Sequence, residues 1–251
     1  MSAIIEVKNL VKKYGDFTAV DGVSFQVQEG EVFGILGPNG AGKTTTLEII
    51  EGLKKPTSGS VTVDGKDVVR HTDAVKSSIG VQLQASSFFE GLNLVELIDT
   101  FAALYGTKVN AMEMLAEVQL TDKAKSQVKE LSGGQKQRLS IAIGLVNDPK
   151  IIFLDEPTTG LDPQARRNLW DLIRQIKAKG KTVVLTTHYM DEAEVLCERV
   201  AVMDGGKIIA MDSPRALIEQ LLATGFSKPV IAQEANLEDV FLNFTGHALR
   251  D

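Results

Sequence analysis

Cysteine, long apolar runs and a surplus of positive charge are all scarce in this sequence. Its 251 residues include one cysteine, so no disulfide can form within the chain, which fits a reducing compartment. No stretch approaches the roughly 18 apolar residues of a membrane span, and the N-terminal residues contain no apolar signal segment. The formal net charge of −6 offers no basic field to nucleic acid. We therefore expect a cytoplasmic protein without a nucleic-acid partner, although it could dock on a membrane protein.

Short apolar runs that end in glycine or polar residues predict buried strands. Three such runs occupy residues 31–37, 150–156 and 181–188. Between the second and the third run, apolar residues at helical spacing predict a helix: Leu169, Leu172, Ile173 and Ile176. A strand, a helix and a strand in this order imply a parallel sheet. Asp-Gly pairs at 64–65 and 204–205 predict two hairpins.

The middle of the chain has a different pattern. Residues 85–148 contain no convincing strand, and their apolar residues, Leu104 and Met112 among them, recur at helical spacing in three stretches. This pattern predicts a helical subdomain inserted into an α/β core that comprises residues 1–84 and 149–221. Residues 222–251 form a short C-terminal tail in this interpretation, and the whole chain is one domain.

A glycine-rich stretch, GPNGAGKTT, follows the first predicted strand and precedes a helix. It matches the pattern G-x-x-x-x-G-K-[ST] in the context that this pattern requires. Glycines let backbone N–H groups converge on phosphate oxygens, and the helix N-terminus adds partial positive charge. We expect Lys43 to reach the β- and γ-phosphates and the Thr44 hydroxyl to hold Mg²⁺. A glycine-rich turn without a ligand explains neither side chain. The predicted binding residues are Gly37, Pro38, Asn39, Gly40, Ala41, Gly42, Lys43, Thr44 and Thr45.

Two acidic residues end the strand IIFLD. Open α/β sheets bind ligands at the carboxyl ends of their strands, so these acids are expected to face the nucleotide. We expect Asp155 to bind Mg²⁺, directly or through water, and Glu156 to orient or deprotonate the attacking water. A pair of solvated acids at a strand end is the alternative. The phosphate loop argues against it for Asp155, whereas spacing alone leaves it open for Glu156.

The stretch LSGGQ precedes the third helical stretch of the middle region. Ser132, Gly133, Gly134 and Gln135 at a helix start could form a second anion site. A serine N-cap with a flexible turn fits the same residues equally well. If both phosphate-binding helix starts are real and cannot share one nucleotide within one chain, two chains could share two nucleotides.

These motifs resemble those of the nucleotide-binding subunit of ABC transporters. The resemblance covers residues 4–222, with the motifs in the order that the family has them. It implies that Tyr14 stacks on adenine and that Gly37–Thr44 is the Walker A loop. It also implies that Ser132–Gln135 belong to the family signature, and that Asp155–Glu156 are the Walker B acid and the catalytic glutamate.

The resemblance assigns three further residues, and for His188 a place at the carboxyl end of a predicted strand, on the same edge as Asp155, adds support. Gln84 matches the glutamine that touches Mg²⁺ and water and communicates with the membrane subunit, although Gln82 lies near the same loop. Asp162 matches the loop that crosses the dimer interface. His188 matches the switch histidine that senses the γ-phosphate.

The resemblance also implies a fold, partners and a place in the cell. The fold is a P-loop NTPase core with a mixed sheet, an antiparallel β subdomain and an inserted helical subdomain. Two subunits pack head to tail around two ATP molecules with Mg²⁺, and hydrolysis reopens the dimer. Integral membrane permease subunits receive this motion, which places the chain peripherally on the cytoplasmic face of the membrane.

Several stretches resemble one branch of the family, the daunorubicin-type exporters of drugs, antibiotics and lipids. The stretches are TTTLEIIEGLKKPTSG, SSFFEGLNLVELI, TTHYMDEAEVLCERVAVMDGGKIIAMDSP and the closing LEDVFLNFTG. The tail between Leu222 and Asn236 is shorter than in many members of that branch. The branch pairs a separate ATPase chain with a separate membrane chain.

Two alternatives have less support. A non-transport ABC ATPase acting on ribosomes or DNA usually carries two ATPase domains or a long coiled coil, and this chain shows neither. Its negative net charge also disfavours binding to nucleic acid. A small-molecule kinase with a phosphate loop does not explain LSGGQ or Asp162.

Overall fold

The structure is a computed structural model that describes residues 3–82, 88–89 and 91–227. The chain divides into two compact units, Met1–Leu217 and Ile218–Asp251. In the first unit a six-stranded sheet runs in the order β10-β9-β3-β8-β7-β6. Its strands are β3 (Val32–Leu36), β6 (Ile79–Val81), β7 (Ile151–Asp155), β8 (Thr182–Thr187), β9 (Arg199–Asp204) and β10 (Lys207–Asp212).

The six-stranded sheet is mixed. β6, β7, β8, β3 and β9 pair in parallel, and β10 alone pairs antiparallel to its neighbour β9. Every residue of β3, β7 and β8 is buried, as expected for strands covered on both faces. The predicted strands and their parallel order are therefore confirmed, and so is the hairpin at 204–205.

Two hydrophobic cores lie on the two faces of this sheet. Alternate residues of β7 belong to different cores, because successive side chains of a strand point to opposite faces. Ile152 and Leu154 pack with α3, α5, α6 and α7, and Ile151 and Phe153 pack with α1 and the antiparallel strands. The helices named here are α1 (Lys43–Ile50), α3 (Leu94–Leu104), α5 (Gly133–Gly144), α6 (Pro163–Ala178) and α7 (Met190–Leu196).

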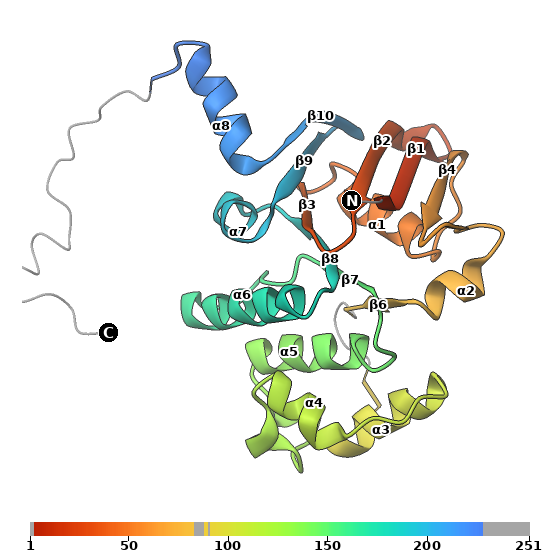
Figure 1. Ribbon diagram of the computed structural model, residues 1–251, viewed down its shortest axis with the longest axis vertical. Helices are drawn as coiled ribbons and strands as arrows, with labels where there is room; N and C mark the ends of the chain where they lie inside the picture. The colour runs from red at the N-terminus through yellow and green to blue at the C-terminus, as the bar shows by residue number, and fades with distance from the viewer. Residues whose placement is uncertain (1–2, 83–87, 90, 228–251) are drawn as a thin grey trace, which may run out of the picture. The chain divides into compact units, whose positions relative to one another are not determined.

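A four-stranded antiparallel sheet forms the second layer of strands, in the order β2-β1-β4-β5 (Figure 1). Its members are β1 (Ala3–Tyr14), β2 (Phe17–Gln28), β4 (Ser58–Val63) and β5 (Lys66–Asp67), and the short helix α2 (Thr72–Lys76) follows. Asp64 and Gly65 both have positive φ angles, 48° and 72°, as the predicted hairpin turn requires. The antiparallel subdomain implied by the family resemblance is present.

The middle of the chain is helical where the structure describes it. It contains α3, α4 (Ala111–Glu117), α5 and two short 3₁₀ helices, Thr121–Lys123 and Val128–Glu130. Figure 1 shows α3, α4 and α5 grouped together, with α5 nearest to the sheet. Two residues that the spacing predicts to be buried are exposed, Leu104 at 68% and Met112 at 43%. Leu104 ends α3 and Met112 lies in the first turn of α4, where less of the core reaches.

The first unit ends within the helix α8 (Pro214–Ala223). Residues 228–251, which contain most of the predicted tail, lie outside the described residues. No helix in the described part of the chain is long and apolar enough to cross a membrane.

Candidate nucleotide-binding site

The glycine-rich loop connects the carboxyl end of β3 to the start of α1. Two of its glycines have no room for a side chain. A Cβ on Gly37 would lie 2.1 Å from the carbonyl oxygen of Met203, and one on Gly42 would lie 2.4 Å from that of Ala19. Gly42 is also the N-cap of α1 with a φ of 100°, a conformation that glycine adopts readily. No side chain of the described residues caps this end of α1, so its first amides face the loop.

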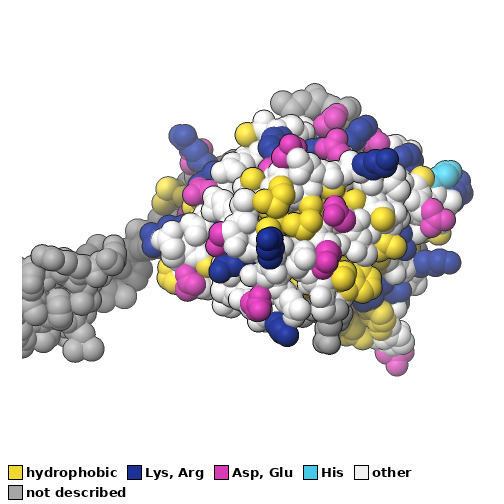
Figure 2. All heavy atoms as spheres, turned by 90° about the horizontal axis from the view of Figure 1, so that it is seen from below, with side chains coloured by type: hydrophobic (Ala, Val, Ile, Leu, Met, Phe, Trp, Pro, Cys, Tyr) yellow, Lys and Arg dark blue, Asp and Glu magenta, His cyan; other side chains and the backbone are white. Residues whose placement is uncertain are grey.

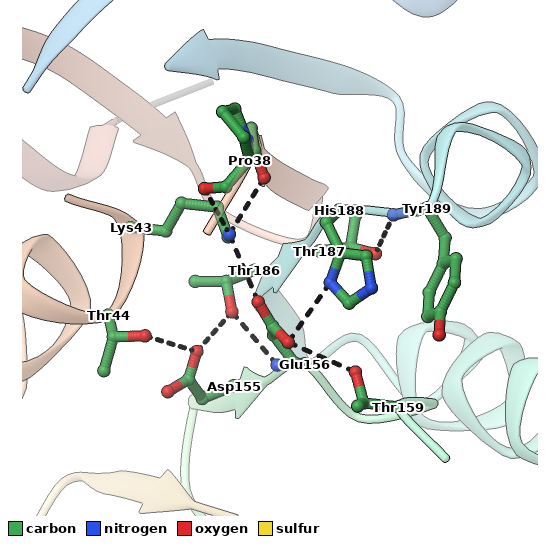
Figure 3. Close-up of polar contacts among 11 residues, drawn as sticks. Pro38, Lys43, Thr44, Asp155, Glu156, Thr159, Thr186, Thr187, His188 and Tyr189 are labelled. Atoms are coloured by element: carbon green, nitrogen blue, oxygen red, sulfur yellow. Dashed lines mark hydrogen bonds and ion pairs between the residues drawn. The ribbon is translucent and has the colours of Figure 1, made fainter. Parts of the chain in front are cut away.

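Lys43 is the cation of this loop, and its side chain is 4% exposed. Its ammonium donates to the carbonyl oxygens of Gly37 (2.9 Å) and Pro38 (3.1 Å). It also lies 3.1 Å from Glu156 Oε1. These contacts, drawn in Figure 3, hold the charge inside the curve of the loop, where a phosphate would lie.

Asp155 ends β7, and two threonine hydroxyls converge on its carboxylate. Thr44 Oγ1 donates to Asp155 Oδ1 at 3.2 Å, and Thr186 Oγ1 donates to the same oxygen in a short hydrogen bond (Figure 3). Burial raises the pKa of Asp155, and the hydroxyls of Thr186 and Thr44 oppose that shift. The Thr44 hydroxyl and the Asp155 carboxylate are oxygen donors of the kind that Mg²⁺ takes together with phosphate oxygens and water. The residues present therefore fit the cation.

Glu156 follows β7 in a left-handed conformation, with a φ of 47°. Its amide donates to Thr186 Oγ1 at 3.0 Å. The carboxylate lies between Lys43 and His188, whose Nδ1 is 3.2 Å from Oε2, and Thr159 Oγ1 donates to the same oxygen at 3.2 Å. Burial alone would raise the pKa of Glu156, but Lys43 and His188 outweigh it and lower that pKa. The group is thus an ionised carboxylate beside the phosphate loop.

Tyr14, the predicted adenine contact, lines the same cavity as the phosphate-loop residues. A cavity of about 230 Å³ is lined by Tyr14, Phe17, Ala19, Asn39, Gly40, Gly42, Lys43, Thr44, Thr45 and Glu156. Tyr14 is 43% exposed, and the ammonium groups of Lys12 and Lys54 lie 5.0 and 5.7 Å from its ring centroid. An exposed ring that lines this cavity can stack on a base. The stacking itself stays a prediction.

The signature residues lie in a different pocket of the same chain. Ser132 is the N-cap of α5, and its hydroxyl accepts from the Gln135 amide at 3.3 Å in a reciprocal capping box. Ser132, Gly134 and Gln135 line a cavity of about 200 Å³ that also contains Asp162, and Gly133 begins the helix. This cavity shares no residue with the one at the phosphate loop. One chain thus carries two separate cavities, one at the phosphate loop and one at the signature residues.

Gln84, the predicted contact with Mg²⁺ and water, lies outside the described residues. Gln82 is described and is 3% exposed. Its amide donates to Gln137 Oε1 of α5 at 2.7 Å. Gln82 therefore has a structural partner of its own, and the assignment of Gln84 stays a prediction.

Sequence reasoning did not identify two threonines at the end of β8. Thr186 binds both Asp155 and the Glu156 amide, and the Thr187 carbonyl oxygen accepts from the Gly37 amide at 3.2 Å. The run TTH at the end of a buried strand was the available signal, because its hydroxyls fall at the edge where parallel strands present ligands.

Glu51 yields a pH-dependent prediction for the fold around the site. This residue is 4% exposed at the end of α1, and burial, with the charges of Asp155 and Glu48, raises its pKa to about 8. A pKa raised above the unfolded value means that the native state binds the extra proton, so stability falls as pH rises between about 4.5 and 8.

Glu51→Gln keeps the shape of the side chain and removes the titrating group. It should therefore reduce the fall of the unfolding free energy with rising pH. We expect it to exceed the wild type in unfolding free energy at pH 8 by on the order of 3 kcal/mol, and far less at pH 5. Urea unfolding at both pH values, without nucleotide or Mg²⁺, measures this. Parallel pH profiles for the two proteins would show that Glu51 does not titrate in this range.

Comparison with known proteins agrees with this geometry. The family model described as "ABC transporter" matches residues 20–159, more than half of the chain. The Nod factor export ATP-binding protein I of Burkholderia lata is 41% identical over 250 residues, which cover 98% of this chain and 82% of that protein. The protein of the same name from Cupriavidus pinatubonensis is 35% identical over 303 aligned residues, which cover 100% of this chain and 93% of the relative.

Solved structures are similar over most of the chain. An ATP-binding cassette of an ABC transporter in its ADP conformation has a TM-score of 0.78 and 29% identity, covering 89% of this chain and 96% of its own. A dimeric cassette in a post-hydrolysis state, bound to ADP and Pi, has a TM-score of 0.75 and 30% identity, covering 84% and 99%. With the phosphate loop, the acids and the signature in their places, the chain belongs to the ABC transporter family, as an ATP-binding subunit that hydrolyses ATP.

Proposed function

We propose that two copies of this chain bind two ATP molecules head to tail, and that hydrolysis drives export through a separate membrane permease. The observation that supports the shared site is the separation of the two half-sites. The phosphate loop and the signature line cavities with no residue in common. A second chain could place its signature against the phosphates bound by the first.

Each side chain of the phosphate-loop half-site has a role in this proposal. Lys43 exchanges its carbonyl contacts for the β- and γ-phosphates, and the Thr44 hydroxyl and Asp155 hold Mg²⁺ together with Gln84. Bound there, the cation neutralises charge on the phosphate oxygens. Glu156 orients or deprotonates the attacking water, and His188 contacts the γ-phosphate.

The other half-site would act on the nucleotide of the partner chain. Ser132, Gly133, Gly134 and Gln135 present a helix start, which favours an anion. Asp162 caps α6 by accepting from the Ala165 amide at 2.8 Å and lines the same cavity. Solved cassettes with similar folds form dimers, one of them with ADP and Pi bound.

Export rests on the named relatives and on the resemblance to the daunorubicin-type branch. Both relatives carry export in their names, and the first aligns with 98% of this chain. The aligned span of 303 residues exceeds the 251 residues here, so that relative contains residues without a counterpart in this chain. The proposed cargo class is drugs, antibiotics or lipids, carried by the permease from the cytoplasmic face.

The helical end of the first unit offers a surface for such a permease. Figure 2 views this end of the molecule and shows apolar side chains gathered between charged ones. Large apolar residues that are exposed in this region include Phe89, Leu104, Tyr105 and Met112. An exposed apolar group with a polar surround is typical of a protein–protein contact. We propose that the membrane subunit docks on this end.

The shared site predicts the effect of a large cation on the signature serine. Ser132→Arg should leave ATP binding to the single chain unchanged, because Ser132 does not line the phosphate-loop cavity. It should block the ATP-dependent dimer, because the arginine fills the place of the partner's phosphate. Size-exclusion chromatography with light scattering in ATP measures this, with Lys136→Arg on the same helix as a control. A Ser132→Arg variant that still dimerises with ATP would disprove the shared site.

A further inference from the structure

A buried carboxylate beside the site has no role in the mechanism above. Glu192 lies on α7, the helix that follows His188, and it is 0% exposed. The indole Nε1 of Trp170, on α6, donates to Glu192 Oε1 at 3.1 Å. A buried carboxyl group is costly unless it is hydrogen-bonded, so its partners define what it holds in place.

Two buried threonines flank the same carboxylate. The hydroxyls of Thr158 and Thr187 lie beside it and oppose the rise in the pKa of Glu192 that burial causes. Thr158 lies in the segment between Glu156 and Asp162, and Thr187 directly precedes His188. Thr187 also accepts from the Tyr189 amide at 3.0 Å, which fixes the turn that carries His188. The two hydroxyls that influence Glu192 therefore belong to the segments that carry both members of the Glu156–His188 pair, and α7 itself begins two residues after His188.

The contact with Thr158 is incomplete. Within the described residues, neither Glu192 Oε2 nor Thr158 Oγ1 makes a hydrogen bond of good geometry, although both atoms are buried. Each of these buried oxygens costs free energy while it lacks a hydrogen bond. The segment around Thr158 leads to Asp162 and α6, which line the half-site that faces a partner chain.

A second set of contacts ties the same elements at the surface. Arg166 of α6 lies 3.2 Å from Asp191 Oδ2 of α7, and its guanidinium lies 4.6 Å from the centroid of the Tyr189 ring. The Tyr189 ring is 4.1 Å from that of His188 (Figure 3 shows the two rings together). The turn with His188 is thus held between α6 and α7. The hydrogen bond from Trp170 to Glu192 is the buried contact between these two helices.

We infer that Glu192 is a positioning residue for hydrolysis: it joins α6, the Thr158 segment and the turn of His188, and so sets His188 against Glu156. The inference rests on the proposed role of His188. It also means that a displacement of α6, whose N-cap is Asp162, would move His188 relative to Glu156. Docking of a partner chain on Asp162 would reach His188 through Trp170 and Glu192.

A double-variant cycle tests this role. The proteins are Glu192→Ala, His188→Ala, the double variant and Glu194→Ala, an exposed acid on the same helix that serves as control. We expect Glu192→Ala to lower kcat by about 10-fold or more, with the ATP dissociation constant within about threefold of wild type. If Glu192 acts through His188, the double variant should be no slower than His188→Ala alone, within about twofold.

The conservative variant provides a second readout. In Glu192→Gln the amide oxygen still accepts from Trp170 and the amide nitrogen donates to a threonine oxygen. We expect it to retain kcat within about threefold of wild type. If Glu192→Ala does not fold, as judged by its melting transition, Trp170→Phe replaces it in the same cycle, because that change removes the donor alone. We again expect a kcat lower than that of the wild type, and no further loss when Trp170→Phe is combined with His188→Ala.

Two other results distinguish failure of the inference on Glu192 from failure of the proposed role of His188. If the losses of Glu192→Ala and His188→Ala multiply in the double variant, Glu192 does not act through His188 and the inference is wrong, while the role of His188 stands. If His188→Ala alone turns over ATP at the wild-type rate, the proposed role of His188 is wrong, and the inference falls with it.

Discussion

Glu156→Gln is expected to reduce steady-state ATP hydrolysis by about 100-fold or more, while ATP binding stays intact. The carboxylate lies between Lys43 and His188, and its pKa is held below the usual range against the effect of burial. Glu156 is therefore ionised at neutral pH and can accept a proton from water. Glutamine keeps the shape and one acceptor oxygen but cannot take that proton.

The loss of turnover should be accompanied by a trapped dimer. Binding closes the proposed dimer and hydrolysis reopens it, so a chain that binds without hydrolysing should accumulate in the closed state. Phosphate release and light scattering, both in MgATP, measure the two effects. Glu194→Gln, which changes an exposed acid on α7, should hydrolyse ATP at the wild-type rate. Normal turnover by Glu156→Gln would remove Glu156 from the chemistry and leave the site without an assigned base.

Lys43→Ala has the second large effect, on binding. The buried ammonium is the one cation lining the cavity at the phosphate loop among the described residues, and alanine leaves the phosphate charges without it. Charge-assisted hydrogen bonds contribute about 1.5–3 kcal/mol each. Loss of the contacts to two phosphates should weaken ATP binding by roughly 100-fold or more.

Titration calorimetry with ATP measures the affinity, and a melting transition shows whether the variant is folded. This second measurement is needed because the substitution also leaves Glu156 without its partner at 3.1 Å. Lys177→Ala, which removes a half-buried lysine of α6 that does not line the cavity, is the matched control. A folded Lys43→Ala with wild-type ATP affinity would contradict the assignment of the phosphate loop.

The parts of the site that local sequence determines are the ones that could be predicted. The phosphate loop is one continuous stretch whose glycines are required by backbone contacts, at Gly37 and Gly42 above all. A continuous motif between a strand and a helix fixes its own geometry, so its position needed no knowledge of the rest. Buried runs such as 151–155 likewise determine strands whatever their neighbours are.

The contacts between segments could not be predicted in this way. Thr186 meets Asp155 because β7 and β8 are paired in one register, which no local pattern encodes. The approach of Trp170 to Glu192 depends on how α6 packs against α7. Burial at helix ends is also beyond a local pattern, since Leu104 continues the spacing of α3 but lies beyond the reach of the core.

The helix start at Ser132 shows a limit of another kind. The sequence fits a serine N-cap and an anion site equally well, and in the single chain the serine is an N-cap. A capping serine and a phosphate-binding helix start have the same local sequence, because both use the unpaired amides of the first turn. Only a bound partner chain distinguishes the two functions.

Affinity capture of the tagged chain from detergent-solubilised membranes of its own host, followed by mass spectrometry, examines the proposed function as a whole. We expect to recover a polytopic membrane protein in amounts comparable to the tagged chain. If the permease docks on the helical end, the Ser132→Arg variant should recover the same membrane protein. Recovery of ribosomal or DNA-repair proteins in place of a permease would contradict the role in export, although it would not contradict the ATPase activity.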